Sequence, residues 1–418
     1  MTEIRDLLID MNPWWKAPHA LSYYDREAYS TIQKFLPLPQ IIVLSGLRRL
    51  GKTTLMLKIV ADSIADGLDS KRVCYFSFDE FKQLGIRGVI DQYEAVIGLN
   101  FSRGQYLLLL DEIQKLSNWE DQLKSLYDIY KGKVKIIASG SESLFIKKKS
   151  KETLSGRLFE FKVDFLTFKE FLRFKKLDLT PANLYSKELG KLFDEFILTL
   201  GFPELVGIGD KEIIKKYIDE SIVGRIVFKD IPEAFNIRDI SVLESLLQSI
   251  MEAPGQLIEL SELAKVLRVS RQTVSNYLRY LEESYLVRKV YNFSNNWRKT
   301  ERKLKKYYPA IIDTTLLFKE DTLSRSTVFE CLLVNQLKAD FFWRDPYKNE
   351  VDVILRNKVP IPVEIKYGKL NYKGLRAFMN KFDIRKGTII SYREETEYKS
   401  NDKTIRVIPA FKYFGPGS

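Results

Sequence analysis

The segment from Gly46 to Thr53 has the residue types and the spacing of a phosphate-binding loop. Its sequence, GLRRLGKT, fits G-x-x-x-x-G-K-[ST], and it lies between the apolar run IIVLS and the helical pattern TTLMLKIV. Gly46 and Gly51 allow backbone N–H groups to wrap a phosphate. Lys52 can reach the β and γ oxygens, and the Thr53 hydroxyl can bind Mg²⁺. The pattern predicts ATP and Mg²⁺ as cofactors.

Two further residues belong to this predicted nucleotide site. Thr54 directly follows the motif, at the start of a helix whose positive dipole end favours a phosphate. Arg49 lies inside the loop and can contact phosphate, although Arg48 and Arg49 can equally pair with acids elsewhere.

The run LLLLDE supplies the acids that a P-loop needs for hydrolysis. A buried strand would deliver Asp111 to the magnesium ion and Glu112 to an attacking water. Taken alone, four leucines before an acid can simply end a core strand. The run IIASGSES brings Ser139 or Ser141 to the same sheet edge as a sensor of the γ-phosphate, or as a turn that caps the next helix.

Four short apolar runs predict the sheet that positions these residues. IIVLSG, VCYFSFDE, YLLLLDE and VKIIASG occur in this order, with helical-period stretches between them. Strands that are apolar throughout are buried on both faces, as parallel sheets require. The alternation predicts a doubly wound α/β domain through about Gly140. The aromatic, proline-punctuated stretch before it is predicted to be a lead-in and not a core element, and residues 144–251 are predicted to be helical.

The chain resembles the archaeal and bacterial AAA-type ATPases whose P-loop reads GxRRxGKT and whose carboxyl-terminal region is nuclease-like. The resemblance extends over GLRRLGKT, LLLLDEIQ, IIASGS, LSGRLFEF, GFPE and EVDVIL…VEIK. It implies an arginine that stabilises transition-state charge, from the same or a neighbouring subunit. Arg157 in LSGR is the candidate, and the alternative is an ordinary surface arginine before a strand.

The stretch SELAKVLRVSRQTVSNYLRYLEESYLV predicts two short helices joined by a turn, as in a winged helix. Ser261 and Ser270 are the expected capping residues. The second helix would expose Arg271, Gln272, Thr273 and Asn276, which are types that contact phosphates and base edges. The basic run that follows, RKVYNFSNNWRKTERKLKKYY, is consistent with a wing along a phosphate backbone. A packing or protein-interaction module is the alternative.

EVDVILRNKVPIPVEIK alternates with period two on both sides of RNKVP, which predicts a hairpin. Folding it symmetrically about Lys358 places Asp352 opposite Glu364. Facing like charges are unfavourable in a sheet, so this arrangement invites a cation. Lys366 lies two residues after Glu364 and shares its face. A slip of one residue would move Asp352 to the other face.

This D…ExK pattern resembles the PD-(D/E)xK nuclease family, which implies metal binding by Asp352 and Glu364 and a catalytic role for Lys366. The family also uses an acid from a preceding helix. Glu330 is the candidate metal ligand, and the alternative is a capping box formed by Thr327 and Glu330. Mg²⁺ is the expected metal, with Mn²⁺ as a second choice. An exposed charged hairpin, or a nuclease fold without activity, is the competing interpretation.

Bulk properties set the outer limits. The net charge of +12 favours an acidic partner such as nucleic acid or an anionic membrane surface. The two cysteines and single histidine fit a reducing cytosol and exclude a structural zinc site. No segment approaches the length of a membrane span, so a cytoplasmic protein without a membrane partner is expected.

The predicted fold is α/β: a P-loop NTPase parallel sheet with a helical lid, a winged helix and a carboxyl-terminal α/β domain like a restriction endonuclease. The expected boundaries are a lead-in at 1–39, the ATPase core at 40–165, the lid at 166–250, the winged helix at 251–312 and the nuclease-like domain at 313–413. The predicted function is an ATPase acting on DNA, with a homo-oligomer conceivable. The rival is an ATP-dependent switch or scaffold that binds partner proteins.

Overall fold

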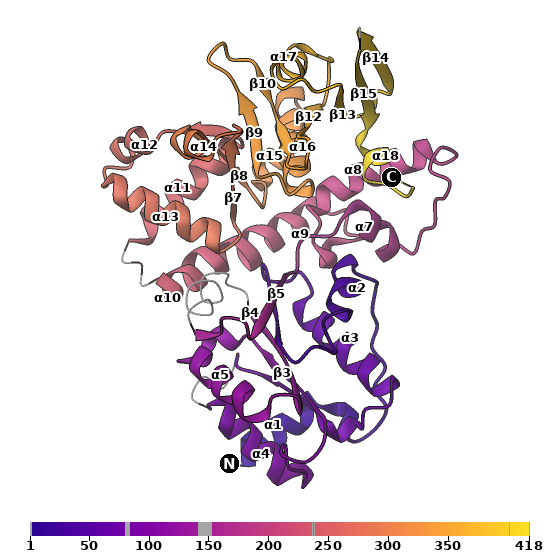
Figure 1. Cartoon of the computed structure of the whole chain (residues 1–418), viewed down its shortest axis with the longest axis vertical. Coiled ribbons are helices and arrows are strands. Elements are labelled where there is room, and N and C mark those ends of the chain that lie inside the picture. The colour runs from indigo at the N-terminus through magenta and orange to yellow at the C-terminus, as the bar shows by residue number, and fades with distance from the viewer. Residues whose placement is uncertain are drawn as a thin grey trace. The chain divides into compact units, whose positions relative to one another are not determined.

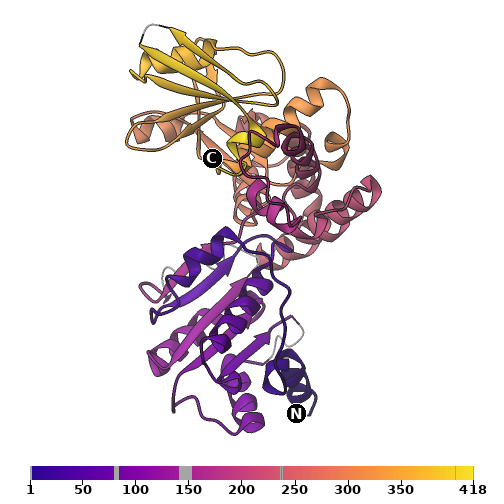
Figure 2. The ribbon, with the colours of Figure 1, turned by 90° about the vertical axis from the view of Figure 1, so that its right-hand side faces the viewer.

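The computed structural model describes residues 2–79, 84–140, 153–235, 237, 239–400 and 402–417. The chain divides into two compact units, Met1–Asp164 and Phe165–Ser418 (Figures 1 and 2). Each unit has its own sheet structure.

Unit 1 is built on a five-stranded parallel sheet with the order β2-β3-β4-β1-β5. Its strands are β1 (Ile41–Ser45), β2 (Val73–Ser77), β3 (Tyr106–Asp111), β4 (Val134–Gly140) and β5 (Leu158–Lys162). Every residue of β1 and β3 is buried, as their unbroken apolar runs predict. The four strands expected from the sequence are confirmed, and the fifth, β5, corrects the helical prediction for the stretch in which it lies.

Helices cover both faces of this sheet. The helix α3 (Lys52–Ala65) packs on one face, while α4 (Ile86–Ile97) and α5 (Trp119–Tyr130) pack together on the other (Figure 1). This distribution follows from right-handed connections, because the chain moves one way along the sheet from β1 to β2 and the other way from β2 onward. The short helices η2 (Ser70–Arg72) and η3 (Ile113–Lys115) complete the unit.

The residues before β1 belong to the core of unit 1, so the interpretation of this stretch as a lead-in is wrong. It contains α1 (Thr2–Met11), η1 (Pro13–Trp15) and α2 (Glu27–Gln33), in which Leu8 and Ile32 are fully buried. The amide of Asn12 donates to the Tyr75 carbonyl at 2.8 Å and accepts from the Tyr75 N–H at 2.7 Å. The segment thus covers the outer edge of β2, which would otherwise present unpaired backbone groups.

Unit 2 begins with helices, as the sequence predicts for this stretch. They are α7 (Phe168–Phe174), α8 (Ser186–Thr199), η5 (Pro203–Leu205), α9 (Lys211–Lys216), the π-helical segments η6 (Tyr217–Gly224) and η7 (Ile226–Asp230), α10 (Ile231–Phe235) and α11 (Ile240–Glu252). Stacked and tilted phenylalanines, among them Phe168, Phe171, Phe193 and Phe196, hold α7 against α8.

A second sheet has the order β10-β9-β7-β8-β6. It comprises β6 (Gln256–Ile258), β7 (Val287–Asn292), β8 (Lys305–Pro309), β9 (Phe341–Arg344) and β10 (Glu350–Val351), accompanied by α12 (Leu260–Val266), α13 (Arg271–Glu283) and α14 (Trp297–Arg302). Because β7 pairs with both β8 and β9, residues on either side of position 313 share one sheet. The boundary expected at that position therefore does not separate two independent sheets.

A third sheet has the order β11-β12-β13-β15-β14 (Figure 2, gold to yellow). It consists of β11 (Val353–Leu355), β12 (Ile361–Lys366), β13 (Lys386–Ser391), β14 (Thr396–Ser400) and β15 (Lys403–Pro409), with α15 (Thr314–Leu317), α16 (Thr322–Gln336), α17 (Lys373–Lys381) and α18 (Ala410–Tyr413). A core of apolar side chains from α17 and from the second and third sheets, among them Trp343, Phe378 and Ile389, holds this region together.

In the described part of the chain, no helix combines the length and the apolar character needed to cross a membrane.

Candidate functional site

The backbone of the P-loop requires both of its glycines. Gly46 has φ 142°, and a Cβ atom there would lie 2.3 Å from the Val163 carbonyl oxygen. Gly51 has φ 91° and directly precedes the first residue of α3. Both conformations favour glycine, and the first also leaves no space for a side chain. The loop therefore takes the bent form that aims backbone N–H groups at an anion.

Lys52 lies where the phosphate-binding role requires it. The side chain is only 6% exposed, and its ammonium donates to the carbonyls of Gly46 at 3.0 Å and Leu47 at 2.9 Å. The ammonium is thus folded back into the hollow of its own loop. The other predicted contacts, Arg49 and Thr54, are both exposed beside it.

Asp111 is the centre of the polar cluster at the carboxyl ends of β3 and β4. Its Oδ2 accepts from the Thr53 hydroxyl at 2.6 Å and from the Tyr75 hydroxyl at 2.8 Å. Its Oδ1 accepts from the Ser139 hydroxyl and from the Glu112 N–H. Three segments distant in sequence therefore meet on one carboxylate. Ser141, the alternative to Ser139, lies outside the described residues.

Tyr75 is a member of this cluster that the sequence analysis missed. Burial, and then the Asp111 charge, raise the pKa of its hydroxyl, so the phenol stays protonated. It therefore donates a hydrogen bond to the carboxylate. The only signal in the sequence is a tyrosine within the apolar run VCYFS, since a buried phenol needs a hydrogen-bond partner.

Glu112 occupies a bend directly after β3. Its φ is 51°, in the left-handed region, and Gln114 donates to its carboxylate Oε2 at 2.6 Å. Left-handed backbone in a residue other than glycine costs roughly 1–2 kcal/mol. The left-handed bend and the Gln114 contact set the orientation of the second acid of the DE pair next to Asp111.

Arg26 also escaped the sequence analysis. It is 7% exposed, and its guanidinium donates to the carbonyl of Leu50 in the P-loop and to that of Asp164, both at 2.7 Å. It therefore ties the P-loop to the segment that follows β5. A single arginine in the aromatic stretch before β1 gives no sequence signal of this role.

Arg157 lies near the amino-terminal ends of the strands, whereas the P-loop of its own chain lies at their carboxyl-terminal ends. Its carbonyl accepts from the Ile41 N–H at the start of β1, whereas the P-loop follows the end of β1. The five residues of β1 place these two ends of the sheet roughly 13–16 Å apart. Its guanidinium is bound by Asp128 through two hydrogen bonds of 2.9 and 3.3 Å. The structure therefore does not bring Arg157 together with Lys52 and Asp111.

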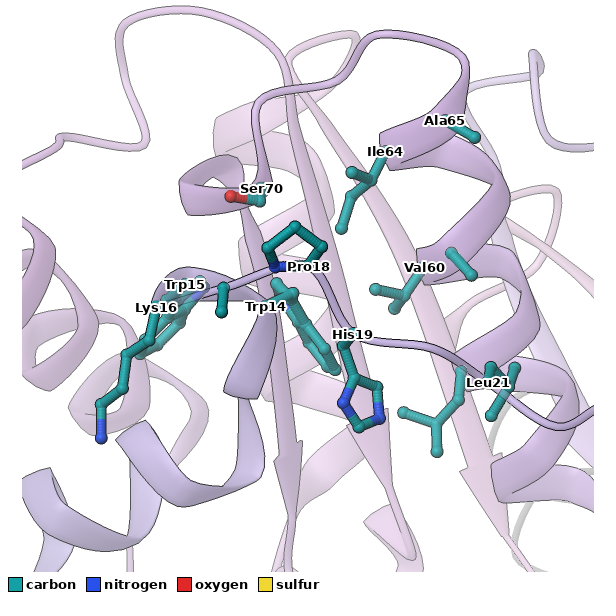
Figure 3. A pocket seen from close by; sticks show the side chains of 13 residues that line it. Trp14, Trp15, Lys16, Pro18, His19, Leu21, Val60, Ile64, Ala65 and Ser70 are labelled. Carbon is teal, nitrogen blue, oxygen red and sulfur yellow. The ribbon is translucent and has the colours of Figure 1, made fainter.

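A cavity of about 420 Å³ also lies in unit 1, against the second half of α3 (Figure 3). Trp14 and His19 face Val60 and Ile64 across it (Figure 3). The indole of Trp14 is held in place by the Val73 carbonyl at 3.3 Å. Because α3 starts at the P-loop and runs back along the sheet, its second half lies toward the opposite edge. The cavity is therefore separate from the nucleotide cluster.

In unit 2, the two helices expected between residues 260 and 283 are present as α12 and α13. Ser270 caps α13, as predicted, by accepting from the Thr273 N–H. Ser261 does not cap α12, because the helix begins one residue earlier and Glu259 accepts from its first N–H groups. On α13, Arg271 and Gln272 are exposed, whereas Thr273 and Asn276 are partly buried.

The basic run between β7 and β8 differs from the predicted wing. It contains a helix, α14, which exposes Arg298, Lys299 and Arg302. Two of its lysines are used internally: Lys289 pairs with Glu282 at 3.0 Å, and Lys306 is only 5% exposed. Lys289 and Lys306 are therefore engaged within the protein, and the expectation of a wing along a phosphate backbone stays a prediction.

The hairpin of the D…ExK pattern has the predicted register. Val353 pairs with Val363 and Leu355 with Ile361, which is the symmetric folding about Lys358. One step further along the ladder, Asp352 stands opposite Glu364. Asp352 forms a bend between β10 and β11, and its Oδ2 accepts from the Ile365 N–H at 2.8 Å.

Asp352 and Glu364 are each 7% exposed. Burial, and then the Asp352 charge, raise the pKa of Glu364. Lys366 donates to Glu364 Oε1 at 2.7 Å, while Glu364 Oε2 is, among the described residues, a buried oxygen without a hydrogen-bond partner. Burial lowers the pKa of Lys366, but the neighbouring carboxylates outweigh it and raise that pKa. Two buried acids and one ammonium thus share a small volume.

Glu330 joins the same electrostatic cluster. Burial and the Asp352 charge raise its pKa, and its Oε1 accepts from the Tyr308 hydroxyl at 2.8 Å. The capping-box alternative is wrong, because α16 begins at Thr322 and Asp321 caps it. Thr327 lies inside the helix and donates to the Leu323 carbonyl. Over the described ranges, no three or more His, Cys, Asp or Glu side chains are gathered closely enough to hold a metal ion as they stand.

Comparison with known families divides the chain into three matches. Residues 38–172 match an AAA domain, residues 190–320 match a domain of unknown function (DUF8612), and residues 326–413 match a domain of unknown function (DUF4143). An uncharacterised protein of Methanocaldococcus jannaschii is 27% identical over 443 residues, covering 93% of this chain and 90% of that protein.

Two other relatives match over part of their length. A second uncharacterised M. jannaschii protein is 29% identical over 61% of this chain, and the match spans 57% of that protein. An uncharacterised Haemophilus influenzae protein is 29% identical over 60% of this chain and 62% of its own length. Among solved structures, a DNA polymerase III gamma subunit-related protein of Thermotoga maritima is 14% identical with a TM-score of 0.28, covering 62% of this chain and all of that one. The family match and the P-loop geometry identify an AAA-type ATPase domain within residues 38–172 of this chain.

Proposed function

We propose that this chain is a Mg²⁺-dependent ATPase that couples its nucleotide state to a DNA-binding, nuclease-like region in unit 2. The observation that carries the ATPase half is the hydrogen bond of 2.6 Å between the Thr53 hydroxyl and Asp111 Oδ2. Two hard oxygen ligands from the P-loop and from β3 are in contact there, which is the donor set that Mg²⁺ prefers.

The roles of the residues follow from this arrangement. On ATP binding, Lys52 would exchange the Gly46 and Leu47 carbonyls for β- and γ-phosphate oxygens. Thr53 and Asp111 would hold the Mg²⁺, which neutralises charge that develops on the phosphates. Glu112 would orient the attacking water, with Gln114 fixing its carboxylate. Ser139 would sense the γ-phosphate through its contact with Asp111.

The order α11, β6, α12, α13, β7, β8 supports a winged helix in the first part of unit 2. Its exposed Arg271 and Gln272 are suited to phosphates and base edges. The exposed Arg298, Lys299 and Arg302 of α14 would add phosphate contacts in place of a wing. We propose DNA as the partner of this surface.

The nuclease-like role rests on Glu364 Oε2, a buried carboxylate oxygen that no described side chain or backbone group satisfies. A buried charged oxygen is costly unless it is paired or binds a metal, and Asp352 stands opposite. Asp352 and Glu364 fit Mg²⁺ or Mn²⁺, with Glu330 as a third ligand through the carboxylate oxygen that Tyr308 does not hold. Lys366 would stabilise charge on the phosphate that is attacked.

A nucleotide switch with an inactive nuclease-like region is the second candidate. This candidate is favoured by the contacts within the cluster: Lys366 forms a salt bridge with Glu364, and the Tyr308 hydroxyl donates a hydrogen bond to Glu330. In this case, ATP binding would control recruitment of partner proteins. Both candidates place the chain in the cytoplasm, where the free, buried Cys74 and Cys331 would stay reduced.

One experiment separates these candidates. ATP hydrolysis is measured with and without DNA, and DNA cleavage is measured in Mg²⁺ or Mn²⁺ for wild type, Asp352→Ala and Glu364→Ala. The proposal expects DNA to stimulate hydrolysis and both substitutions to abolish cleavage. ATPase activity indifferent to DNA, together with equal cleavage by all three proteins, would support the switch instead.

A further inference from the structure

The strand β8 enters the carboxylate cluster from outside the segment that carries the D…ExK residues. Its side chains alternate between the two faces of the sheet. Lys306 and Tyr308 lie on one face and interact with Glu350 and Glu330 respectively. Tyr307 lies on the other face, in the electrostatic environment of Lys289. One strand therefore presents two chemically distinct faces to two different neighbourhoods.

Tyr308 fixes the acid on the preceding helix. Its hydroxyl is fully buried and donates to Glu330 Oε1 at 2.8 Å. Burial and the nearby Glu330 and Asp352 charges raise the pKa of Tyr308 well above its usual value, so the phenol keeps its proton. A phenol that keeps its proton beside a carboxylate acts as a donor, which sets the rotation of the Glu330 carboxyl group.

Lys306 fixes the strand that leads into Asp352. Its ammonium, 5% exposed, pairs with Glu350 Oε1, while Arg344 donates to Glu350 Oε2 at 3.1 Å. Glu350 lies two residues before Asp352, at the start of β10. Two cations from different strands thus clamp β10 immediately before the bend that carries Asp352, while the Ile365 N–H holds the Asp352 carboxylate itself.

The Lys306 ammonium has further neighbours besides Glu350. The ammonium lies 5.2 Å from the centre of the Phe342 ring in β9 and 3.5 Å from the Tyr308 hydroxyl. A shorter or neutral side chain at this position would leave the partly buried Glu350 with one fewer partner. Removing one member of a buried charge pair is costly, because it leaves the other charge uncompensated.

We propose that Tyr308 and Lys306 are positioning residues for the metal site of unit 2, so that the segment before residue 313 supplies part of that site. Tyr308 orients Glu330, and Lys306 holds Glu350 and, through it, the backbone before Asp352. The inference rests on the proposed metal site at Asp352 and Glu364. It makes β8 a structural component of the nuclease-like centre, in addition to the DNA-binding role proposed for α13 and α14.

The test measures Mn²⁺ binding to the full chain. The electron paramagnetic resonance signal of free Mn²⁺ reports how much of the ion remains unbound. An Asp111→Asn background removes the charged oxygen ligand that could hold Mn²⁺ beside the P-loop, and no nucleotide is added. The variants are Tyr308→Phe, Lys306→Met and Lys306→Arg. Tyr307→Phe and Lys305→Met are the matched controls, since they make the same chemical changes one residue away on the other face of β8.

Tyr308→Phe and Lys306→Met are expected to weaken Mn²⁺ binding by about 10- to 100-fold, as for other groups that orient metal ligands. Lys306→Arg is expected to restore part of the affinity, because it keeps the charge opposite Glu350. Both controls should bind Mn²⁺ as the parent protein does. Thermal unfolding of each variant distinguishes a loss of positioning from a loss of fold. Should Lys306→Met fail to fold, the result for Tyr308→Phe decides, because this substitution removes a single oxygen atom.

Two results overturn the inference in distinguishable ways. If the parent protein does not bind Mn²⁺ and Asp352→Ala changes nothing, the proposed metal site fails and the inference fails with it. If the parent binds Mn²⁺ through Asp352 and Glu364 but Tyr308→Phe and Lys306→Met match their controls, only the positioning role is wrong.

Discussion

The hydroxyl of Thr53 and the carboxylate of Asp111 are joined by a hydrogen bond of 2.6 Å, although 58 positions separate the two residues in the chain. Thr53 lies in the first turn of α3 and Asp111 ends β3. In the sheet, β4 separates β3 from β1, so the contact closes over the end of β4, where Ser139 also reaches Asp111. The three side chains form a small polar cluster beside the P-loop.

Asp111→Asn is expected to lower ATP hydrolysis by about 100-fold or more. The substitution removes a charged metal ligand, metal ions supply several kcal/mol of transition-state stabilisation, and each 1.36 kcal/mol is tenfold in rate. Steady-state phosphate release at saturating ATP and Mg²⁺ measures the effect. Asp121→Asn, which neutralises an exposed acid on α5, is the control and should leave the rate unchanged. Equal rates for both variants would remove Asp111 from the metal site.

If Arg157 acts as an arginine finger, it must act on the nucleotide of a neighbouring subunit, because it lies near the start of β1 and its own P-loop follows the end of β1. Arg157→Ala is expected to lower hydrolysis by about 1000-fold if it acts as an arginine finger. A mixture of Arg157→Ala and Lys52→Ala proteins should then regain activity, since each supplies what the other lacks. Asp128→Asn breaks the salt bridge between Asp128 and Arg157 but leaves the arginine in place, so this variant should stay active. A mixture no more active than its components would exclude this role.

Gly46→Ala is expected to destabilise unit 1 by about 2–5 kcal/mol, from an unfavourable φ and a clash with backbone. The added Cβ would lie 2.3 Å from the Val163 oxygen. Gly132→Ala is the matched control: this glycine also has a positive φ, 78°, but a Cβ there meets nothing within 4 Å. It should cost only about 1 kcal/mol. Urea unfolding measures both, and equal losses would show that the contact with Val163 relaxes freely.

The stability of unit 2 without metal is expected to fall as the pH rises from about 4.5 to 8. Burial and the Asp352 charge raise the pKa of Glu364 to about 8. The folded state therefore holds a proton in this window that the unfolded state has released, and its contribution to stability is lost as the pH passes the folded pKa.

Thermal unfolding in EDTA across this range measures the slope. Glu364→Gln should flatten it, because the glutamine does not titrate. Glu397→Gln, on the exposed strand β14, should keep it. A slope that persists unchanged in Glu364→Gln would assign the proton to another group.

Arg271→Ala is expected to weaken DNA binding and to reduce the slope of log K against log[salt] by about 1, as for the loss of one phosphate contact. Arg271 is exposed at the first turn of α13. Arg279→Ala, exposed near the other end of the same helix, is the control and should leave the slope unchanged. Fluorescence anisotropy with labelled duplex DNA at several salt concentrations gives both slopes. A slope that Arg279→Ala changes as much as Arg271→Ala would place the contact elsewhere.

The sequence by itself determined the features that depend on local pattern. Unbroken apolar runs predicted β1 to β4, because only strands buried on both faces need them. Glycine and lysine spacing predicted the P-loop, and the period-two alternation around Lys358 predicted the register that brings Asp352 opposite Glu364. Each of these follows from backbone conformation or from alternation within a few residues.

The tertiary structure decided which distant side chains meet. Arg26 reaches the P-loop, Tyr75 reaches Asp111, and Tyr308 reaches Glu330, yet no local pattern names the partner of any of the three. Such contacts depend on strand order and on the packing of segments far apart in the chain. The same long-range order placed Arg157 away from its own P-loop and buried Lys306 among acids, although no local pattern in the sequence marks either outcome.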